Sequence, residues 1–200
     1  MDDPFLVSLV AFFVILGGLL LWMASVYNRL VRLRNRIEAL WAAIDVQLKR
    51  RHDLIPNLVN AVEGYATHER GTLDEVAQAR SQAIAAKTVG DQAKAENMLT
   101  GALSRLFSDV EQYPDLKAEG DFQRLEHELA DLERILALSR DAYNMTVQGY
   151  NNTVETFPST IVAWFADFEK KEYLVTGDAE RAVPGVDVDV PAVPPMRTAV

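Results

Sequence analysis

The stretch YNRLVRLRNRIEALWAAIDVQLKRRHDLIPNLVNAV, residues 27–62, carries one apolar stripe along its whole length. The members of the stripe are Leu30, Leu33, Ile37, Leu40, Ile44, Leu48, Ile55, Leu58 and Val62. Most of them recur at steps of three and four, the spacing that keeps side chains on one face of an α-helix. A stripe this regular has to be buried. The stretch therefore predicts a long helix that supplies one seam of a helical core, an interpretation favoured over a ligand groove.

Pro56 falls inside this helical pattern. A proline lacks the N–H that would bond to the carbonyl of His52, four residues back, and in a helix interior it costs about 3 kcal/mol. The stripe resumes in phase at Leu58, so we expect a kink at Pro56 rather than the end of the helix. Further on, the segment from Thr72 to Glu75 has the form of a capping box, and a new helix starting at Thr72 is an open alternative.

An uncharged apolar run of 22 residues, 5–26, precedes this stretch. As a helix it extends roughly 33 Å, enough to cross a hydrocarbon core of about 30 Å. A cleaved signal peptide is the alternative. It fits poorly, because the leader is acidic, the apolar run is too long and no clear A-x-A site follows. We therefore expect residues 1–4 to be a short N-terminal segment and residues 5–26 to be a transmembrane helix.

Positive charge is concentrated just after the predicted span. Four arginines follow it within ten residues: Arg29, Arg32, Arg34 and Arg36. Only two charged residues, both aspartates, precede the span. By the positive-inside rule, the N-terminus lies outside and everything after the span lies in the cytoplasm. The arginines also form a candidate membrane-proximal basic site. The attraction of each to anionic lipid headgroups is worth about 1 kcal/mol when it lies near the membrane surface. A topology signal alone explains them equally well.

The net charge of −9 conceals a strong asymmetry along the chain. Residues 27–52 hold seven Arg or Lys and two acidic side chains, whereas residues 53–200 hold thirteen basic and twenty-five acidic ones. A body this acidic argues against nucleic acid as a partner. The chain contains no cysteine. Disulfides, thiolate nucleophiles and cysteine-based zinc sites are therefore excluded.

Three further helices are predicted after residue 90. The first runs from about 91 to 112 and the second from 121 to 157, with Asp91 and Asp121 as their N-caps. A short helix over 159–168 follows, with Ser159 in the capping position. Residues 176–200 contain four prolines and little apolar bulk, which indicates a tail without its own core. The predicted fold is all-α, with one span and a bundle over residues 27–175 made of three long helices and a short fourth.

The pair Tyr143-Asn144 recurs seven residues later as Tyr150-Asn151, and an earlier pair at 27–28 has the same form. A spacing of seven places the two tyrosines on one helical stripe, which favours a packed ladder with its hydroxyls at the edge. A binding role for the tyrosines is the weaker alternative. Both later asparagines lie in N-x-T sequons, which a cytoplasmic location would make irrelevant.

The three histidines, His52, His68 and His127, offer no metal-ligand spacing. His68 lacks the second histidine of the metalloprotease motif, and none of the three completes the Glu-x-x-His pairs of di-iron bundles. No glycine-rich phosphate loop and no nucleophile elbow occur. The residues predict no catalytic site, no cofactor and no metal. A binding protein is therefore favoured over a hydrolase whose site forms only in three dimensions.

Several segments together resemble the LemA family of bacterial membrane proteins. They are YNRLVRLRNRIEALWAAIDVQLKRRHDLIPNLV (27–59), GYATHERGTLDEVAQAR (64–80), YPDLKAEGDFQRLEHEL (113–129) and YNMTVQGYNNTVETFPS (143–159). The resemblance covers roughly residues 5–190. It implies one membrane helix and then an antiparallel bundle, with the first helix continuous through Pro56 and Thr72. One departure is Asp167, which with its neighbours stands where the family tends to have Gly-Phe.

The family has no established enzymatic activity, cofactor or catalytic residue, so the resemblance implies none here. Its members are often encoded near membrane metalloproteases of the HtpX type, which implies an adaptor or scaffold role. We therefore expect a single-pass protein of the bacterial cytoplasmic membrane. Its expected partners are the lipid bilayer and other proteins, with a membrane metalloprotease and further copies of the chain as candidates. No nucleic-acid partner is expected.

The arginine asymmetry predicts the orientation of the chain. A reporter fused after Val200 should be active in its cytoplasmic form, because the excess of positive charge follows the span. Changing Arg29, Arg32, Arg34 and Arg36 together to glutamate should disturb insertion or orientation. Activity of a periplasm-dependent reporter at the same position in the unaltered chain would reverse the predicted topology.

Overall fold

The structure, a computed structural model, describes residues 4–65 and 70–175. These residues form six α-helices and no strand. The helices are α1 (Pro4–Glu63), α2 (Arg70–Ala85), α3 (Val89–Val110), α4 (Pro114–Lys117), α5 (Gly120–Glu155) and α6 (Ser159–Phe165). The predicted all-helical class is confirmed, but the chain divides into more helices than the three long and one short that we expected. The expected tail, 176–200, lies outside the described residues.

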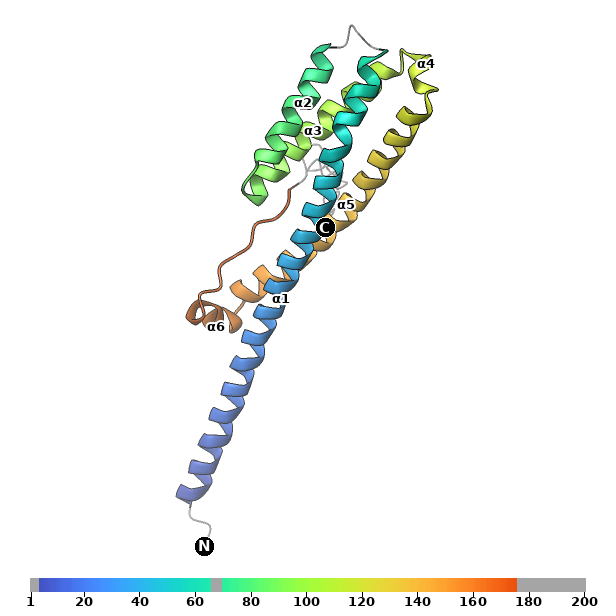
Figure 1. The fold of residues 1–200 in the computed structure, drawn as a ribbon. Helices are drawn as coiled ribbons and strands as arrows, with labels where there is room; N and C mark the ends of the chain where they lie inside the picture. The colour runs from blue at the N-terminus through green and yellow to red at the C-terminus, as the bar shows by residue number, and fades with distance from the viewer. Residues whose placement is uncertain (1–3, 66–69, 176–200) are drawn as a thin grey trace, which may run out of the picture.

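α1 is one helix that continues through Pro56 (Figure 1). Within the described ranges it is the one helix long and apolar enough to cross a membrane, and no residue of its most apolar window is buried. Farther along, one face is buried at positions that belong to the predicted stripe. These are Leu30, Ile37, Ile44, Leu48, Ile55, Leu58 and Val62. The helix is thus continuous as expected, while a bend at Pro56 stays a prediction.

The chain reverses direction after α1. Gly64 and Tyr65 form a turn, and α2 lies back along the last part of α1 (Figure 1). The expectation that the first helix continues past Thr72 is therefore wrong. The alternative of a new helix is the correct one, although α2 begins at Arg70, two residues before the predicted start at Thr72. The Thr72 hydroxyl donates instead to Oδ2 of Asp109 on α3, at 2.8 Å.

Two apolar clusters make up the core. The proximal cluster, nearer the candidate span, comprises Leu30, Ile37, Ile44, Leu48, Ala93, Leu136, Tyr143, Val147, Tyr150, Ala163, Phe168 and Leu174. The distal cluster joins the end of α1 to α2, α3, α4 and the start of α5, and includes Ile55, Leu58, Val62, Val76, Leu99, Leu106, Leu116, Phe122 and Leu129. The two clusters occupy different heights along α1, so α1 is the common wall of both.

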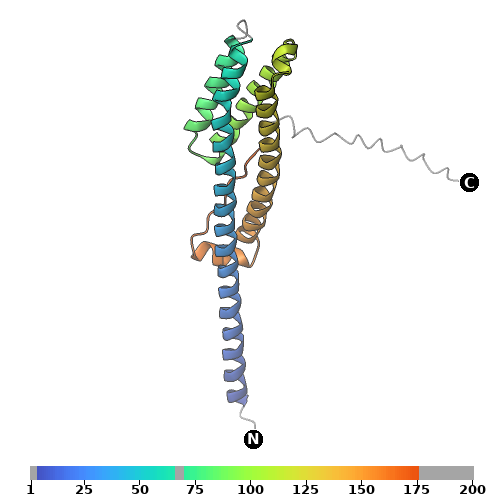
Figure 2. The same cartoon turned by 45° about the vertical axis from the view of Figure 1, so that its right-hand side comes forward.

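α1 and α5 share the most extensive contact between any two of the helices, and they lie side by side in both views (Figures 1 and 2). The ring of Trp41 packs against that of Tyr143, with centroids 5.8 Å apart. Arg51 lies ten residues after Trp41 on α1, and it contacts Glu133, which lies ten residues before Tyr143 on α5. The paired positions therefore descend along α5 as they ascend along α1.

Two helices begin slightly before the predicted positions. Thr88 caps α3 by accepting a hydrogen bond from the N–H of Asp91 at 3.0 Å, so Asp91 lies inside the first turn. Glu119 caps α5 by accepting from the N–H of Phe122, also at 3.0 Å. Asp121, the predicted cap, pairs with an arginine on the same helix instead. In both cases the true cap is a side chain that reaches three residues forward.

α6 is shorter than predicted and ends in a Schellman motif. The N–H of Phe168 bonds to the carbonyl of Ala163 at 2.9 Å, and the N–H of Asp167 to that of Trp164 at 3.4 Å. Asp167 takes φ 55°, the left-handed conformation in which glycine is the usual residue. The position falls where the resemblance places a Gly-Phe pair. Ser159 does not act as the predicted cap, because its hydroxyl donates back to a carbonyl in the preceding turn.

The repeated Tyr-Asn pairs of α5 bind the backbone of the non-helical segment 169–175. Asn144 donates to the carbonyl of Leu174 at 3.0 Å and accepts from its N–H at 2.9 Å. Asn151 makes the same two bonds with Lys171, both at 2.9 Å. The tyrosine hydroxyls donate to further carbonyls, Tyr143 to that of Glu172 and Tyr150 to that of Glu169. We call these four side chains the Tyr-Asn clamp.

The spacing of the clamp has a geometric explanation. Seven residues of an α-helix advance about 10.5 Å, and three residues of an extended chain advance about 10 Å. The two asparagines are seven residues apart and bind residues three apart, so each repeat meets an equivalent backbone site. The earlier pair takes no part in this, because Tyr27 packs on the ring of Phe168 and Asn28 is exposed. The hydroxyls thus hold a backbone segment rather than forming a free edge.

Burial raises the pKa of the Tyr143 hydroxyl above its usual 10.0, and the carboxylate of Glu172 raises it further. Burial also raises the pKa of Tyr150, where Arg34 opposes the shift and Glu169 adds to it. Both hydroxyls therefore remain donors at neutral pH. The stability that they contribute is fully present below the ordinary tyrosine pKa and is lost as the pH rises through the raised values.

We expect Asn144→Ala or Asn151→Ala to release segment 169–175. Each change removes two hydrogen bonds worth about 1 kcal/mol apiece, so each should lower the free energy of unfolding of the segment by about 2 kcal/mol. Hydrogen exchange at the amides of Leu174 and Lys171 measures this directly. Asn152→Ala, on the exposed side of the same helix, is the matched control. Unchanged protection of both amides in the Asn144 and Asn151 variants would contradict the clamp.

Candidate functional site

Glu96 on α3 is a buried carboxylate, 1% exposed, that contacts two basic side chains of α1. Its Oε2 lies 3.2 Å from Nη1 of Arg51, and its Oε1 lies 2.7 Å from Nε2 of His52. Gln92, one turn earlier on α3, donates to Oε1 at 2.9 Å. Because a carboxylate paired with arginine acts as an acceptor, Nε2 of His52 carries the proton in this contact. Arg51, His52 and Gln92 thus supply hydrogen-bonding or ionic partners to both oxygens of the buried carboxylate.

Arg51 extends this network to α5. Its Nη1 lies 3.1 Å from Oε2 of Glu133, and its Nη2 donates to the hydroxyl of Thr100 at 2.9 Å. Glu133 also pairs with the largely buried Arg140, at 3.5 Å. The network lies between the proximal and distal clusters and joins α1 to both α3 and α5. We call its members the ion layer: Arg51, His52, Glu96, Glu133 and Arg140.

Pro56 provides the docking point for α2. Because proline has no N–H, it leaves the carbonyl of His52 without its partner four residues ahead in the helix. Nε of Arg80 on α2 donates to this carbonyl at 2.7 Å. The interruption in α1 thus coincides with the place where α2 attaches to it. His52 contributes twice, since its ring meets Glu96 while its carbonyl meets Arg80.

A groove of about 320 Å³ opens between α3 and α5 beside the ion layer. Its apolar lining is Leu103 and Phe107 from α3 with Leu129 and Ala130 from α5, and its polar lining is Arg51, Thr100, Ser104, Glu126 and Glu133. The backbones of α3 and α5 make few close approaches, which leaves this side of the bundle open. We call it the α3–α5 groove. One end of the groove therefore reaches the Arg51–Glu133 pair.

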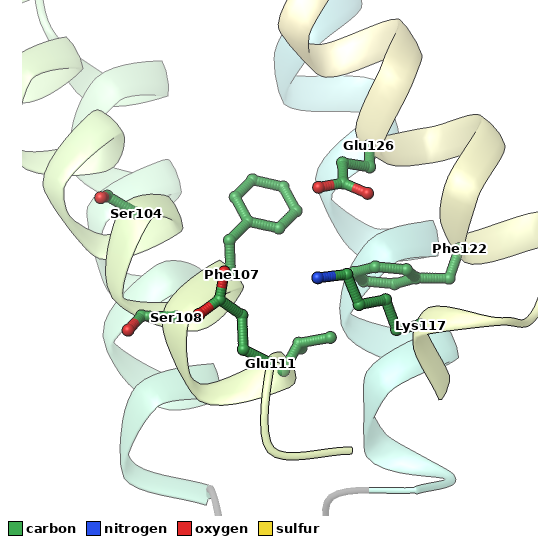
Figure 3. A pocket seen from close by; sticks show the side chains of 8 residues that line it. Ser104, Phe107, Ser108, Glu111, Lys117, Phe122 and Glu126 are labelled. Atoms are coloured by element: carbon green, nitrogen blue, oxygen red, sulfur yellow. The ribbon is translucent and has the colours of Figure 1, made fainter. Parts of the chain in front are cut away.

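The groove continues toward α4 as a second hollow of about 230 Å³ (Figure 3). The two share Ser104, Phe107 and Glu126 in their linings. Figure 3 shows the ring of Phe107 projecting from α3 toward Phe122 on α5, and the ring centroids are 6.2 Å apart. Lys117 of α4 reaches into the same space. Phe107 and Phe122 therefore give this hollow an apolar part, and polar or charged groups make up most of the rest of its lining.

The described ranges contain no group of three or more His, Asp or Glu side chains placed to hold a metal ion. The groove instead combines an apolar floor with carboxylates at its edges. Such a surface is chemically suited to an apolar segment of another chain whose flanking residues are basic. The ion layer is suited to hold the two walls, α3 and α5, in place around that segment.

The four predicted membrane-proximal arginines are all exposed on α1, just beyond the candidate span. The guanidinium of Arg34 also lies over the ring of Phe168, 5.5 Å from its centroid. These four residues are far along α1 from the ion layer, so the structure does not bring the predicted residues into one site. His127 is exposed on α5, and His68 lies outside the described residues.

The ion layer was not predicted from the sequence, although the sequence carries a signal for part of it. Arg51 follows Leu48 by three and precedes Ile55 by four, so it occupies a position of the buried stripe. On α3, Glu96 precedes Leu99 by three, so it too lies in phase with a buried stripe. A charged residue in phase with a buried stripe needs a partner, because an unpaired buried charge is very costly. Periodicity alone could not identify that partner.

Comparison with known proteins places these features within a family. The LemA family profile matches residues 40–188, a range that contains the ion layer, the α3–α5 groove and the Tyr-Asn clamp. Protein LemA of Metamycoplasma hominis is 30% identical over 166 residues, covering 81% of this chain and 73% of that protein. The candidate span precedes the matched range.

Magnetosome proteins are also similar to this chain. MamQ of Magnetospirillum gryphiswaldense and MamQ 1 of Paramagnetospirillum magneticum are each 24% identical to it over 173 residues, which cover 74% of this chain. The match spans 64% of the length of those magnetosome proteins. The similarity therefore leaves about a third of each of them without a counterpart here.

We expect Glu96→Ala to destabilise the fold by about 3 kcal/mol, because it leaves the buried His52 ring without its partner and removes one of the two carboxylates that contact the buried Arg51. Glu75→Ala is the matched control. It removes an exposed ion pair with Arg105, and such pairs contribute about 0–1 kcal/mol. Chemical denaturation of both variants in the same detergent or bilayer measures the difference. Equal effects of the two changes would show that the ion layer is no more important than a surface pair.

Proposed function

This chain belongs to the LemA family, and from that premise we propose that it is a membrane-tethered scaffold or adaptor without catalytic activity of its own. In this proposal residues 5–26 of α1 cross the bacterial cytoplasmic membrane once. The N-terminus is outside, and the remaining helices stand in the cytoplasm as an antiparallel bundle. The bundle acts by binding other proteins.

Membrane tethering is supported by the first turns of α1. They are apolar, unburied and continuous with the helix that anchors both core clusters. Exposure of an apolar helix of this length to water is unfavourable, whereas the hydrocarbon core of a bilayer is an apolar environment that it can span. Because α1 continues as one helix into the core, the bundle has a rigid link to the membrane. That geometry is typical of a tether and holds the binding surface at a defined height.

The observation that carries the adaptor proposal is the α3–α5 groove. Phe107 and Leu129 give it an apolar floor, and two carboxylates outside the ion layer, Glu111 and Glu126, stand at its edges together with Lys117. The body beyond residue 52 carries an excess of acidic groups as well. An apolar segment with basic flanks would bury its apolar face on Phe107 and Leu129, and its charges would meet the carboxylates. We infer that the partner supplies such a segment.

A membrane metalloprotease is one candidate partner, and a second copy of the chain is another. The first comes from the resemblance to the family alone, and the residues of the groove do not distinguish between the two. Among the similar proteins, MamQ is named as a magnetosome protein.

We expect a photo-crosslinking amino acid at Ser104, inside the groove, to capture a protein partner in intact cells. The same amino acid at Ala142 should capture none, since Ala142 is exposed on the opposite side of α5 from the groove lining. Ala130→Trp should then abolish the Ser104 cross-links by filling the groove. Ala142→Trp is the size-matched control and should leave them intact.

Two results would contradict the groove as the binding surface. One is equal capture from both positions, and the other is cross-linking at Ser104 that survives Ala130→Trp. Circular dichroism and thermal unfolding of both tryptophan variants confirm that the fold is retained. Activity of the purified chain toward peptides, lost in an Ala130→Trp variant that remains folded, would contradict the non-catalytic part of the proposal.

A further inference from the structure

α6 and the residue pair before it expose a compact group of large apolar side chains. Phe157 is 75% exposed, Trp164 77% and Phe165 72%, and Ile161 is also exposed. Ile161, Trp164 and Phe165 follow one another at steps of three and one, so they project from one side of α6, and Phe157 lies in the turn just before the helix. The rings of Trp164 and Phe165 stack edge to face, 4.8 Å apart. We call these four side chains the aromatic foot.

The opposite face of α6 is firmly packed. Val162 and Ala163 are buried, and Ala163 belongs to the proximal cluster together with Leu30 and Tyr150. The Schellman motif fixes the end of the helix. α6 is therefore held in one orientation by its buried face, and the aromatic foot points away from the core. Exposed apolar patches of this kind normally meet another apolar surface.

The aromatic foot lies at the height where the candidate span ends. Val26, the last residue of the apolar run, packs against the same cluster that contains Ala163. The ring of Tyr27 lies 5.6 Å from that of Phe168, the residue that closes α6. Figures 1 and 2 show α6 at the end of the bundle nearest the span, and it contacts α1 there. A bilayer around residues 5–26 would therefore have its surface beside α6.

Charges around the foot agree with this placement. Arg29, Arg32 and Arg36 are exposed on the turns of α1 that follow Val26. Near α6, Glu155 is paired with Lys170, so one of the nearby acids is neutralised. Cationic side chains at the surface and aromatic rings at the headgroup level are the usual pair of interfacial anchors.

We propose that the aromatic foot inserts into the headgroup region of the leaflet from which α1 emerges. This inference rests on the proposed crossing of the membrane by α1. The chain then contacts the bilayer at two points. One is the span, which ends at Val26, and the other is the aromatic foot on α6, which packs beside Val26 through the proximal cluster. Two points restrict rotation of the bundle about α1. The α3–α5 groove is thereby presented in one fixed direction along the membrane surface.

The three tryptophans of the chain lie at different heights relative to the expected bilayer, so their fluorescence can report how deep each one lies. Trp22 lies inside the span, Trp164 belongs to the foot, and Trp41 lies fifteen residues beyond Val26, about 22 Å higher along the helix. Variants with two of the three changed to phenylalanine leave one emitter each. The full chain is reconstituted into phosphatidylcholine–phosphatidylglycerol vesicles that contain phosphatidylcholine brominated at shallow or deep acyl positions.

We expect brominated lipid to quench Trp22 and Trp164 and to leave Trp41 unchanged. Shallow bromines should roughly halve the Trp164 emission and act on it more strongly than deep ones, as suits an interfacial ring. Phe157→Ser with Phe165→Ser should weaken the quenching of Trp164 without affecting Trp22. If Trp41→Phe disturbs its packing on Tyr143, the single Trp22→Phe variant serves, since Trp41 is then a constant background.

The outcomes separate this inference from the proposed function. Quenching of Trp22 without quenching of Trp164 overturns the foot and leaves the membrane crossing intact. Absence of quenching at Trp22 overturns the membrane crossing itself, and the foot with it. A blue-shifted but unquenched Trp164 shows that protein covers the foot, for example a second copy of the chain, and also overturns the inference.

Discussion

The arrangement of the bundle depends on one buried carboxylate. Glu96 is enclosed between two apolar clusters, where an unpaired charge would be very costly, so it has to be met by basic groups. Arg51 and His52 meet it from α1, and this contact sets the position of α3 along α1. Arg51 then reaches Glu133, which sets the position of α5. One set of buried charges thus joins three helices at one height, and we expect it to favour this register over others that apolar packing could accept.

Pro56 connects this layer to α2. A proline in a long helix normally weakens it by removing one hydrogen bond. Here the carbonyl left without its partner is that of His52, and Arg80 of α2 supplies the missing donor. The same residue, His52, therefore joins α1 to α3 through its ring and to α2 through its carbonyl. The hydrogen bond that Pro56 removes from α1 is thus replaced by one between α1 and α2, and both helices contribute residues to the distal cluster.

The positions of the candidate span, the core clusters, the clamp and the groove can all be described along the length of α1. Its apolar start gives the chain a candidate attachment to the membrane, and its buried face organises both clusters. The Tyr-Asn clamp returns the chain along α5 after α6, so segment 169–175 covers the proximal cluster. The groove lies at the other end, where α3 and α5 diverge. The clamp and α6 therefore belong to the membrane-proximal half, and the candidate binding surface belongs to the distal half.

Much of the fold could be predicted from the sequence, because helical periodicity depends on neighbours three or four residues apart. The stripe of α1, the apolar run before it and the seven-residue spacing of the Tyr-Asn pairs are all of this local kind. The same reasoning showed that Pro56 interrupts a helix without ending it. Periodicity left the end of the first helix open, and the resemblance implied continuity past Thr72, whereas the chain turns at Gly64 and Tyr65.

The candidate site could not be predicted, because its contacts join residues that only chain reversal brings together. Arg51 and Glu96 are forty-five positions apart, and nothing in either neighbourhood specifies the other. The target of the clamp was hidden for the same reason, since the seven-residue repeat on a helix matches a three-residue repeat on a segment that has no periodicity of its own. The sequence by itself determined the helices and the stripes that they bury. The tertiary structure decided which buried charges meet, because the cost of leaving a charge unpaired is settled only when the helices pack.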